Sequence, residues 1–354
     1  MATFRKIGVL TSGGDAPGMN AAVRAVVRSA LARGVEVVGI YKGYQGLITG
    51  EVKPLTSADV ANITGLGGTM LYSDRCDEFK TEEGMAKAVA TCKANGIDGI
   101  VAIGGDGTFR GATDLSMRGI PTIGIPATID NDITSTDYSI GFDTAMNTVL
   151  TAADCLRDTC ESHARCEVIE VMGRDAGFIA IECGISCGAV AIAVKELPFD
   201  EDACVEKILE LRAKGQRSFI VMHSEGMPKG FGEALTERLN KVDIDTRFIR
   251  LAHMVRGGAP TLRDRLTATR MGDYAVDLIL EGKSDLVVCM KNDKLTSTEI
   301  KYALVVDRMY KNKLKDGDLD KFTAEQIDSM KARCVEKAAL LSDLMDVAKT
   351  LAKN

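Results

Sequence analysis

Three aspartates and several glycines occur together in one stretch of the chain, residues 100–132, with the sequence IVAIGGDGTFRGATDLSMRGIPTIGIPATIDND. The stretch predicts an apolar strand, a Gly-Gly-Asp-Gly-Thr turn, a short helix, a second apolar strand and an acidic run. Two strands that end at the same edge of a sheet would bring Asp106, Asp130 and Asp132 into one crevice, which is where open α/β sheets bind ligands. Carboxylates beside open backbone amides indicate a site for a magnesium-bound polyphosphate.

The glycines of the turn allow a phosphate to approach the main chain. Gly104, Gly105 and Gly107 carry no Cβ, so a β- or γ-phosphate can reach the backbone N–H groups. Asp106 lies among them and needs a cation between its carboxylate and the phosphate. Mg²⁺ meets that need, since it takes one or two carboxylates plus phosphate oxygens. A tight strand-to-helix turn with an aspartate cap is the alternative, and the turn alone does not decide between the two.

The run Pro-Ala-Thr-Ile-Asp-Asn-Asp, residues 126–132, places charges directly after an apolar strand. Asp130 is suited to accept a proton from a substrate hydroxyl, as the catalytic aspartate does in other phosphoryl-transfer enzymes. Asp132 would then act on the metal or on the substrate. A solvated loop is the alternative, but a second acidic turn beside the first favours the catalytic interpretation.

Alternating strands and helices predict the fold class, an α/β protein of two doubly wound domains with largely parallel sheets. A second glycine turn, at Gly13 and Gly14, follows the first strand. The motif RFIRLAHMVRGGAP is expected to return the chain to the first sheet, so both domains are discontinuous. We expect the first domain to comprise residues 1–142 plus 257–307 and the second 143–256 plus 308–354. The expected strands are 6–10, 35–41, 100–103, 189–194, 218–222 and 285–290.

Composition excludes several classes of function. A net charge of −6 and a pI near 5.4 leave no basic field for nucleic acid or anionic lipid, so any anion site must be local. No apolar run reaches the length of a membrane span. The 10 cysteines include no Cys-x-x-Cys pair, and only 3 histidines accompany them. Together with the lack of a signal peptide, this predicts buried thiols in a cytoplasmic protein.

The C-terminal region predicts one long helix. Thr323 and Gln326 form a capping-box signature, and Phe322 and Ile327 are placed for the accompanying hydrophobic staple. Apolar residues at helical spacing follow over residues 327–348. We expect this helix to pack against the protein rather than to bind a ligand.

Taken together, the motifs resemble those of the phosphofructokinase family, in its ATP-dependent bacterial type. They occur in order across nearly the whole chain: GVLTSGGDAPGMNA, IGGDGT, PATIDND, SIGFDTA, IEVMGR and RLAHMVRGGAP. The resemblance implies Mg²⁺ and ATP on the first domain and fructose 6-phosphate in the cleft, with phosphoryl transfer to the sugar 1-hydroxyl. It also implies a homotetramer in which neighbouring subunits complete the active sites.

The resemblance assigns roles residue by residue. The ATP-binding positions are Gly14, Tyr44, Arg75, Cys76, Gly105, Asp106, Gly107 and Thr108, with Asp106 as the magnesium ligand. The catalytic positions are Asp130 as the general base, Arg174 on the transferred charge, and Thr128 and Asp132 beside them. The other sugar-phosphate contacts are Met172, Gly173, Glu225, His253 and Arg256, with Arg165 and Arg247 reaching in from a neighbouring subunit. Arginine's planar fork suits phosphate, which agrees with this set.

Two departures from the family pattern affect regulation and donor choice. Arg24, Arg28 and Arg157 match basic positions of the bacterial effector site, but Ser57, Gln216 and Val190 replace an arginine, a lysine and a metal-binding glutamate. This predicts weak binding of ADP and phosphoenolpyruvate. Gly107 favours ATP over pyrophosphate, because relatives that use pyrophosphate usually carry aspartate there. Ala127, where they carry lysine and ATP-using relatives glycine, is less decisive.

Three alternative functions stay open at this point. One is a pyrophosphate-dependent phosphofructokinase, and another is an enzyme of the NAD-kinase or lipid-kinase group, which also looks similar around Gly-Gly-Asp-Gly-Thr. The latter has no reason to carry PATIDND, MGR and HMVRGG. A non-catalytic sugar-phosphate sensor is the third, but it would not need a general base.

Overall fold

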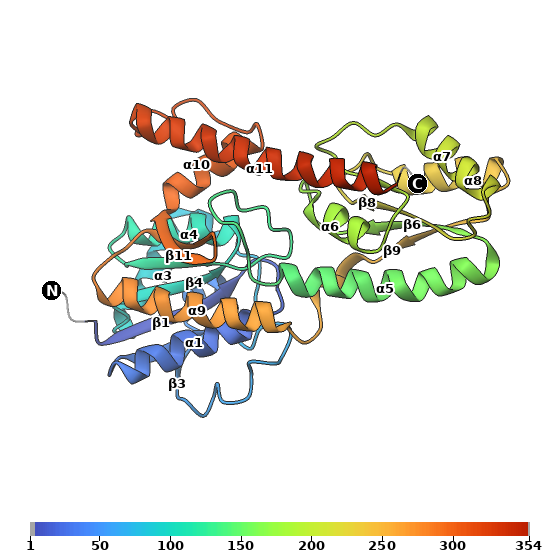
Figure 1. Cartoon of the computed structure of the whole chain (residues 1–354). Coiled ribbons are helices and arrows are strands. Elements are labelled where there is room, and N and C mark those ends of the chain that lie inside the picture. The colour runs from blue at the N-terminus through green and yellow to red at the C-terminus, as the bar shows by residue number, and fades with distance from the viewer. Residues whose placement is uncertain (1–3, 353–354) are drawn as a thin grey trace. The chain divides into compact units, whose positions relative to one another are not determined.

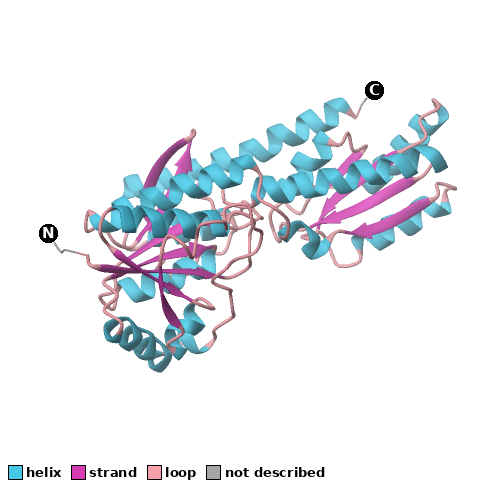
Figure 2. Cartoon of the chain, turned by 90° about the horizontal axis from the view of Figure 1, so that it is seen from below, coloured by secondary structure: helices cyan, strands magenta, loops and turns pink. Residues whose placement is uncertain are grey.

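The computed structural model describes residues 4–352, which form two compact units (Figure 1). The first unit comprises the residues up to 129, together with 133–144 and 256–334. The second comprises residues 130–132, 145–255 and those from 335 onward. Each unit is an α/β layer structure in which helices flank a sheet (Figure 2), as the alternating pattern predicted.

Within the described residues, the first unit holds a seven-stranded sheet in the order β11-β10-β5-β4-β1-β2-β3. The two edge strands β3 and β11 are antiparallel to their neighbours, and the five strands between them run parallel. The strand order reverses beside β1 and β4, which makes their carboxyl ends the topological switch point. The strands are β1 (Lys6–Ser12), β2 (Glu36–Ile40), β3 (Val52–Leu55), β4 (Gly99–Gly104), β5 (Thr122–Pro126), β10 (Leu286–Lys291) and β11 (Lys294–Glu299).

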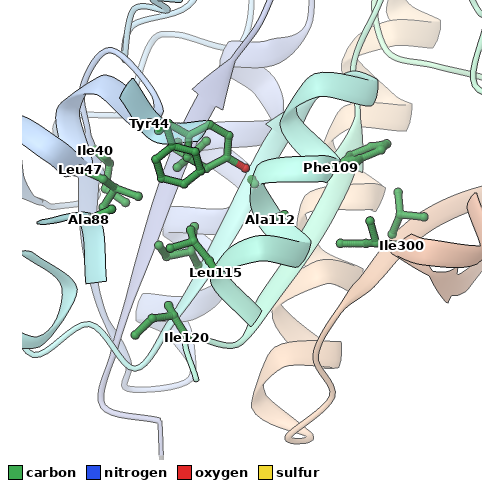
Figure 3. Packing of buried hydrophobic residues seen from close by; sticks show 14 of the residues in the cluster. Ile40, Tyr44, Leu47, Ala88, Phe109, Ala112, Leu115, Ile120 and Ile300 are labelled. Carbon is green, nitrogen blue, oxygen red and sulfur yellow. The ribbon is translucent and has the colours of Figure 1, made fainter. Parts of the chain in front are cut away.

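Helices cover both faces of this sheet. On one face α1 (Met19–Ala32) and α9 (Leu262–Leu280) pack together, because the apolar stripe of α1 is fully buried. The opposite face carries the buried cluster shown in Figure 3, which includes Tyr44, Phe109 and Leu115. The helices that contribute to this cluster are α2 (Tyr44–Thr49), α3 (Glu82–Ala94), α4 (Asp106–Ser116) and α10 (Ile300–Tyr310).

The second unit holds a smaller sheet of four parallel strands in the order β7-β8-β6-β9. Its strands are β6 (Cys166–Val171), β7 (Ala191–Ala193), β8 (Phe219–Ser224) and β9 (Thr246–Arg250). The associated helices are α5 (Phe142–His163), α6 (Phe178–Ser186), α7 (Glu201–Ala213) and α8 (Phe231–Lys241). Buried residues from these strands and helices, such as Val168, Ile208 and Leu235, form the core of the unit.

The segment 308–334 differs from the expected division. We expected it with the second domain, but it groups with the first unit, because Met330 is buried against Val305 and Val306 of α10. Its helix, α11 (Ala324–Leu351), begins at the predicted capping box. The Thr323 N–H donates to Gln326 Oε1 at 2.9 Å, and the Gln326 N–H donates to Thr323 Oγ1 at 3.2 Å. None of the helices in residues 4–352 is long and apolar enough to span a membrane.

Candidate functional site

Two glycine turns of the first unit lie side by side at the switch point. The parallel register pairs Ser12, at the end of β1, with Gly104, at the end of β4. The Thr108 hydroxyl donates to the Ser12 carbonyl at 2.9 Å and so ties the two turns together. The structure therefore brings the predicted Gly14 and Gly105–Thr108 positions to one edge of the sheet, where the backbone amides at the start of α4 favour an anion.

The glycines of the second turn differ in what they leave room for. A Cβ on Gly104 would lie 2.3 Å from the Ser12 carbonyl oxygen and 2.3 Å from Thr108 Oγ1, so internal packing requires glycine there. A Cβ on Gly107 would meet no atom within 4 Å, and one on Gly105 would meet only Thr128 Cβ, at 3.9 Å. The backbone φ angle is not positive at Gly105 or at Gly107. Folding does not account for glycine at these two positions, whereas close approach of a ligand does.

Asp106 is the first residue of α4 and the predicted magnesium ligand. Its Oδ2 accepts from the Arg110 guanidinium at 2.6 Å, and its side chain is 29% exposed. Burial raises the pKa of Asp106, the charge of Asp307 raises it further, and Arg110 opposes the shift. No group of three or more metal-ligating side chains occurs in the described part of the chain. One carboxylate nevertheless fits Mg²⁺ that arrives on a polyphosphate, because phosphate oxygens and water complete its coordination.

Tyr44 lies in the core of the first unit. Its ring stacks on Phe79 at a centroid distance of 4.2 Å, and its hydroxyl donates to the Thr108 carbonyl at 2.5 Å. The ATP contact that the resemblance assigns to Tyr44 stays a prediction, and the structure adds a second role, support of the turn that carries Thr108. Arg75 is exposed and Cys76 is half-buried at the edge of the same core cluster.

Arg256 lies against the first glycine turn. Its Nη1 donates to the Asp15 carbonyl at 3.2 Å, and a Cβ on Gly14 would be 2.6 Å from the same nitrogen. The structure thus places a guanidinium of the returning segment beside the phosphate-compatible turn after β1. The resemblance assigns Arg256 to the sugar phosphate. Within the first unit, Arg256 lies next to Gly14.

In the second unit, the turn after β6 is held by a carboxylate that directly follows β8. Glu225 Oε1 accepts from the Gly173 N–H at 3.3 Å and from the Arg174 N–H at 2.9 Å. Gly173 has a φ of +143° and Arg174 a φ of +53°, the left-handed region. An arginine in that conformation stores strain, which is common at functional sites. Glu225 therefore fixes the Met172–Arg174 turn, a role that its motif did not reveal.

The Arg174 side chain extends from this turn to the predicted general base. Arg174 Nε lies 3.3 Å from Asp130 Oδ2. Asp130 is completely buried, whereas the Arg174 side chain is 62% exposed. The neighbouring candidates Thr128 and Asp132 are half-buried, and the Ser139 hydroxyl donates to the Thr128 carbonyl at 2.7 Å. The structure thus places a guanidinium beside the buried carboxylate that the sequence predicts as the general base.

Three of the predicted sugar-phosphate residues line one cavity of the second unit. Met172, Glu225 and His253 lie on the wall of a space of about 410 Å³. Met172 is buried, and His253 is exposed on a short 3₁₀ helix (Ala252–Arg256). The carboxyl ends of β6 and β8 meet here, since Val171 pairs with Ser224. A cavity at this edge of a parallel sheet is the expected place for a small polar ligand.

The structure does not bring Arg165 and Arg247 to this cavity. Arg165 directly precedes β6, and Arg247 lies at the start of β9, where the register pairs it with Glu167. Both therefore lie at the amino-terminal edge of the sheet. β6 has six residues, so the two edges are ~20 Å apart. Asp245, which the sequence did not single out, forms ion pairs with both arginines.

The predicted effector positions also fall into separate groups. Arg24 and Arg28 lie on α1, with Arg24 half-buried and Arg28 exposed, and Ser57 is exposed. In the second unit, the Arg157 guanidinium donates to the backbone carbonyls of Cys187 and Gly188. Val190 and Gln216 line a cavity of about 120 Å³ with Ala348 and Leu351 of α11 and with Ala352, which follows that helix.

The switch-point turns and the buried carboxylate with its arginine define an α/β protein built to handle phosphate groups. The family model described as Phosphofructokinase matches residues 6–279. An ATP-dependent 6-phosphofructokinase from Clostridium novyi is 50% identical over 314 residues, which cover 88% of this chain and 98% of that protein. One from Halalkalibacterium halodurans is 49% identical over 84% of this chain and 93% of its own length. The chain belongs to the phosphofructokinase family, as its motifs predicted.

Solved structures agree with this assignment. Phosphofructokinase from Saccharomyces cerevisiae superimposes with a TM-score of 0.85 at 28% identity, over 98% of this chain and 50% of that one. Phosphofructokinase from Pichia pastoris gives 0.84 at 31% identity, over 99% of this chain and 39% of that one. The chain thus spans half or less of these larger proteins. A pyrophosphate-dependent phosphofructokinase from Marinobacter aquaeolei, at 21% identity and a TM-score of 0.73, shares the fold.

Proposed function

We propose that this protein transfers the γ-phosphoryl group of MgATP to the 1-hydroxyl of fructose 6-phosphate, the committed phosphorylation of glycolysis. The observation that carries the proposal is the near-complete alignment with proteins named ATP-dependent 6-phosphofructokinase, at 50% identity over 98% of one such relative. The buried Asp130 with Arg174 beside it, at 3.3 Å, supplies the chemistry that this reaction needs.

Asp130 acts as the general base in this proposal. It takes the proton from the sugar 1-hydroxyl as that oxygen attacks the phosphoryl group. Arg174 approaches the same carboxylate through Nε, which leaves its two terminal nitrogens to stabilise the charge that develops on the transferred group. Thr128 and Asp132 flank the base along the chain and orient the substrate around it.

The first unit binds the nucleotide. The turn with Gly105 and Gly107 offers open backbone to the phosphates, and Gly14 contributes from the neighbouring turn. Arg75 and Cys76, which are adjacent in the chain, would contact the nucleoside part of ATP. Mg²⁺ held by Asp106 would neutralise charge on the phosphates when bound.

The second unit binds the sugar phosphate, and the resemblance adds Arg256 to its ligands. Met172, Gly173, Glu225 and His253 surround the sugar from one chain. Arg165 and Arg247 lie at the other edge of the same sheet, ~20 Å away, so they serve a second copy of the chain. We therefore propose a homo-oligomer with shared sites, a tetramer by analogy with the family.

The test is a coupled assay for ADP release. ADP release that requires fructose 6-phosphate supports the kinase, and ADP release with NAD or a lipid as the acceptor would replace it. Binding of fructose 6-phosphate without turnover would indicate a sensor. The donor is decided in the same assay at saturating sugar phosphate. We expect turnover with MgATP and negligible turnover with pyrophosphate, and an equal or faster pyrophosphate rate would reject ATP as the donor.

A further inference from the structure

A carboxylate joins the two arginines at the amino-terminal edge of the second sheet. Asp245 Oδ2 accepts from Arg165 Nε at 2.6 Å, and Asp245 Oδ1 lies 3.1 Å from Arg247 Nη2. Arg165 directly precedes β6 and Arg247 lies in the neighbouring β9, 82 positions further along the chain, so only the fold brings them together. Within residues 4–352, Asp245 is the one carboxylate recorded in an ion pair with either guanidinium.

The contact leaves the phosphate-binding edge of Arg165 available. Asp245 accepts from the Nε–H of Arg165, so this contact does not use the two terminal nitrogens, which form the planar fork that suits phosphate. The side chains are 27%, 57% and 40% exposed for Arg165, Arg247 and Asp245, so the group faces outward from the sheet edge. A long arginine side chain held at one nitrogen loses rotamer freedom before the ligand arrives, which lowers the entropic cost of binding.

The charge of the group remains suited to an anion. Glu167 lies behind it on β6 and is 3% exposed. Burial raises the pKa of Glu167, with Arg165 opposing the shift, so Glu167 adds less negative charge than an exposed carboxylate would. The Arg165 contact, followed by the charges of Arg247 and His163, lowers the pKa of Asp245. Two guanidinium groups against one ionised carboxylate leave a net positive charge for a phosphate dianion.

We propose that Asp245 is a positioning residue for the sugar 6-phosphate. It holds the guanidinium groups of Arg165 and Arg247 together in advance, ready to bind the 6-phosphate of a substrate in a neighbouring subunit's site. Asp245 touches neither sugar nor nucleotide and acts only through the two arginines. The inference rests on the proposed function, because it takes the phosphate of fructose 6-phosphate as the group that these arginines bind.

The test is steady-state kinetics of the full chain with Asp245→Asn, which removes the charge and keeps the shape. We expect the KM for fructose 6-phosphate to rise about tenfold, since one charge-assisted orienting contact is lost. The kcat and the KM for MgATP should stay near wild type, because neither the base nor the nucleotide turn is altered. Asp245→Glu, which restores a carboxylate, should recover most of the sugar-phosphate KM.

The matched control is Glu210→Gln. It removes one carboxylate from an exposed pair with Lys214, at 2.6 Å on α7 of the same unit, and should leave both KM values unchanged. In an Arg165→Ala background, Asp245→Asn should add little, because the two act as one unit.

An unchanged or lower sugar-phosphate KM in Asp245→Asn would overturn the inference. Activity of the wild-type protein with fructose 6-phosphate would still support the proposed function. A rise in both KM values with a lower melting temperature would also overturn it, in favour of a structural role. Wild-type protein without turnover of fructose 6-phosphate would overturn the proposed function itself.

Discussion

Asp130 and Arg174 are the residues on which the proposed chemistry depends. Asp130→Asn keeps the shape of the buried side chain but removes the acceptor of the hydroxyl proton. We expect turnover to fall by roughly 10²–10⁴-fold while both substrates still bind, the usual cost of losing a general base. Steady-state rates and isothermal titration with fructose 6-phosphate would measure the two effects. Asp154→Asn, an exposed change on α5, is the control. Near-normal turnover in Asp130→Asn would refute the assignment.

The two kinds of glycine in the turn after β4 give a second prediction. Gly104→Ala should destabilise the protein by about 1–3 kcal/mol, because its Cβ would lie 2.3 Å from the Ser12 carbonyl oxygen. Gly107→Ala should be neutral or more stable by about 0.5 kcal/mol, because it lies in α4 and meets nothing within 4 Å. Thermal unfolding compares the pair directly. Equal losses in both variants would show that Gly107 also serves packing.

A charged substitution at Gly107 tests whether the turn binds the nucleotide. Gly107→Asp should depress the ATP reaction far more than it changes the binding of sugar phosphate, since a carboxylate there repels the nucleotide phosphates. If Gly107→Asp instead weakens fructose 6-phosphate binding and leaves the KM for MgATP unchanged, the turn does not bind the nucleotide.

Single residues also show what sequence could and could not predict. Asp106, Gly105 and Gly107 were found because a strand end, a glycine turn and a carboxylate are adjacent in the chain. The support that Tyr44 gives to the Thr108 turn was not predicted, since a motif match does not show that a ring packs in the core against Phe79. Asp245 was missed because its partner Arg165 is 80 residues away and meets it only through the parallel alignment of β6 and β9.

At the scale of elements, α2 supports the nucleotide turn through one buried hydroxyl. Tyr44→Phe removes the bond to the Thr108 carbonyl and keeps the stacking on Phe79. We expect a loss of about 1 kcal/mol in unfolding free energy and a higher KM for MgATP, because the Thr108 end of the turn is less firmly held. Chemical denaturation and kinetics measure these. A stable variant with unaltered ATP kinetics would limit Tyr44 to packing.

The elements themselves were largely predictable, because apolar strands alternate with helices and caps mark their ends. The capping box before α11 is confirmed by its two reciprocal hydrogen bonds. The position of 308–334 was not predictable, because grouping with α10 depends on which partner buries Met330. Hydrophobic spacing shows that a helix face is buried but not against which element.

At the scale of the whole molecule, the separation of the two edges of the second sheet predicts complementation. Asp130→Asn and Arg165→Ala should each be nearly inactive. The first variant lacks the general base, and the second lacks an arginine that binds the sugar phosphate of a neighbouring subunit. Mixed subunits should regain activity above either parent, because some sites then combine an intact base with an intact arginine. Coexpression followed by the coupled assay tests this, and no gain after verified subunit mixing would contradict shared sites.

Regulation should be weak in the assembled protein. The positions where the family carries an effector-site lysine and glutamate are Gln216 and Val190, which here line a cavity with apolar residues of α11. Fewer cationic and metal-binding groups mean weaker binding of ADP and phosphoenolpyruvate. Saturation curves for fructose 6-phosphate with and without each compound provide the check. A strong shift at sub-millimolar levels would overturn the prediction.

The interleaving of the two units in the chain also sets an order in time during synthesis. All four strands of the second sheet have been made once Arg250 leaves the ribosome, whereas the first sheet waits for β10 and β11, which end at Glu299. At ~5–20 residues per second, the roughly 50 residues between these points take roughly 3–10 s. Until β10 is made at Lys291, β5 presents an unpaired parallel edge, because β10 is its missing neighbour. The sheet that begins first is thus completed last, and the nascent chain is most prone to aggregation at the edge of β5 just before β10 is made.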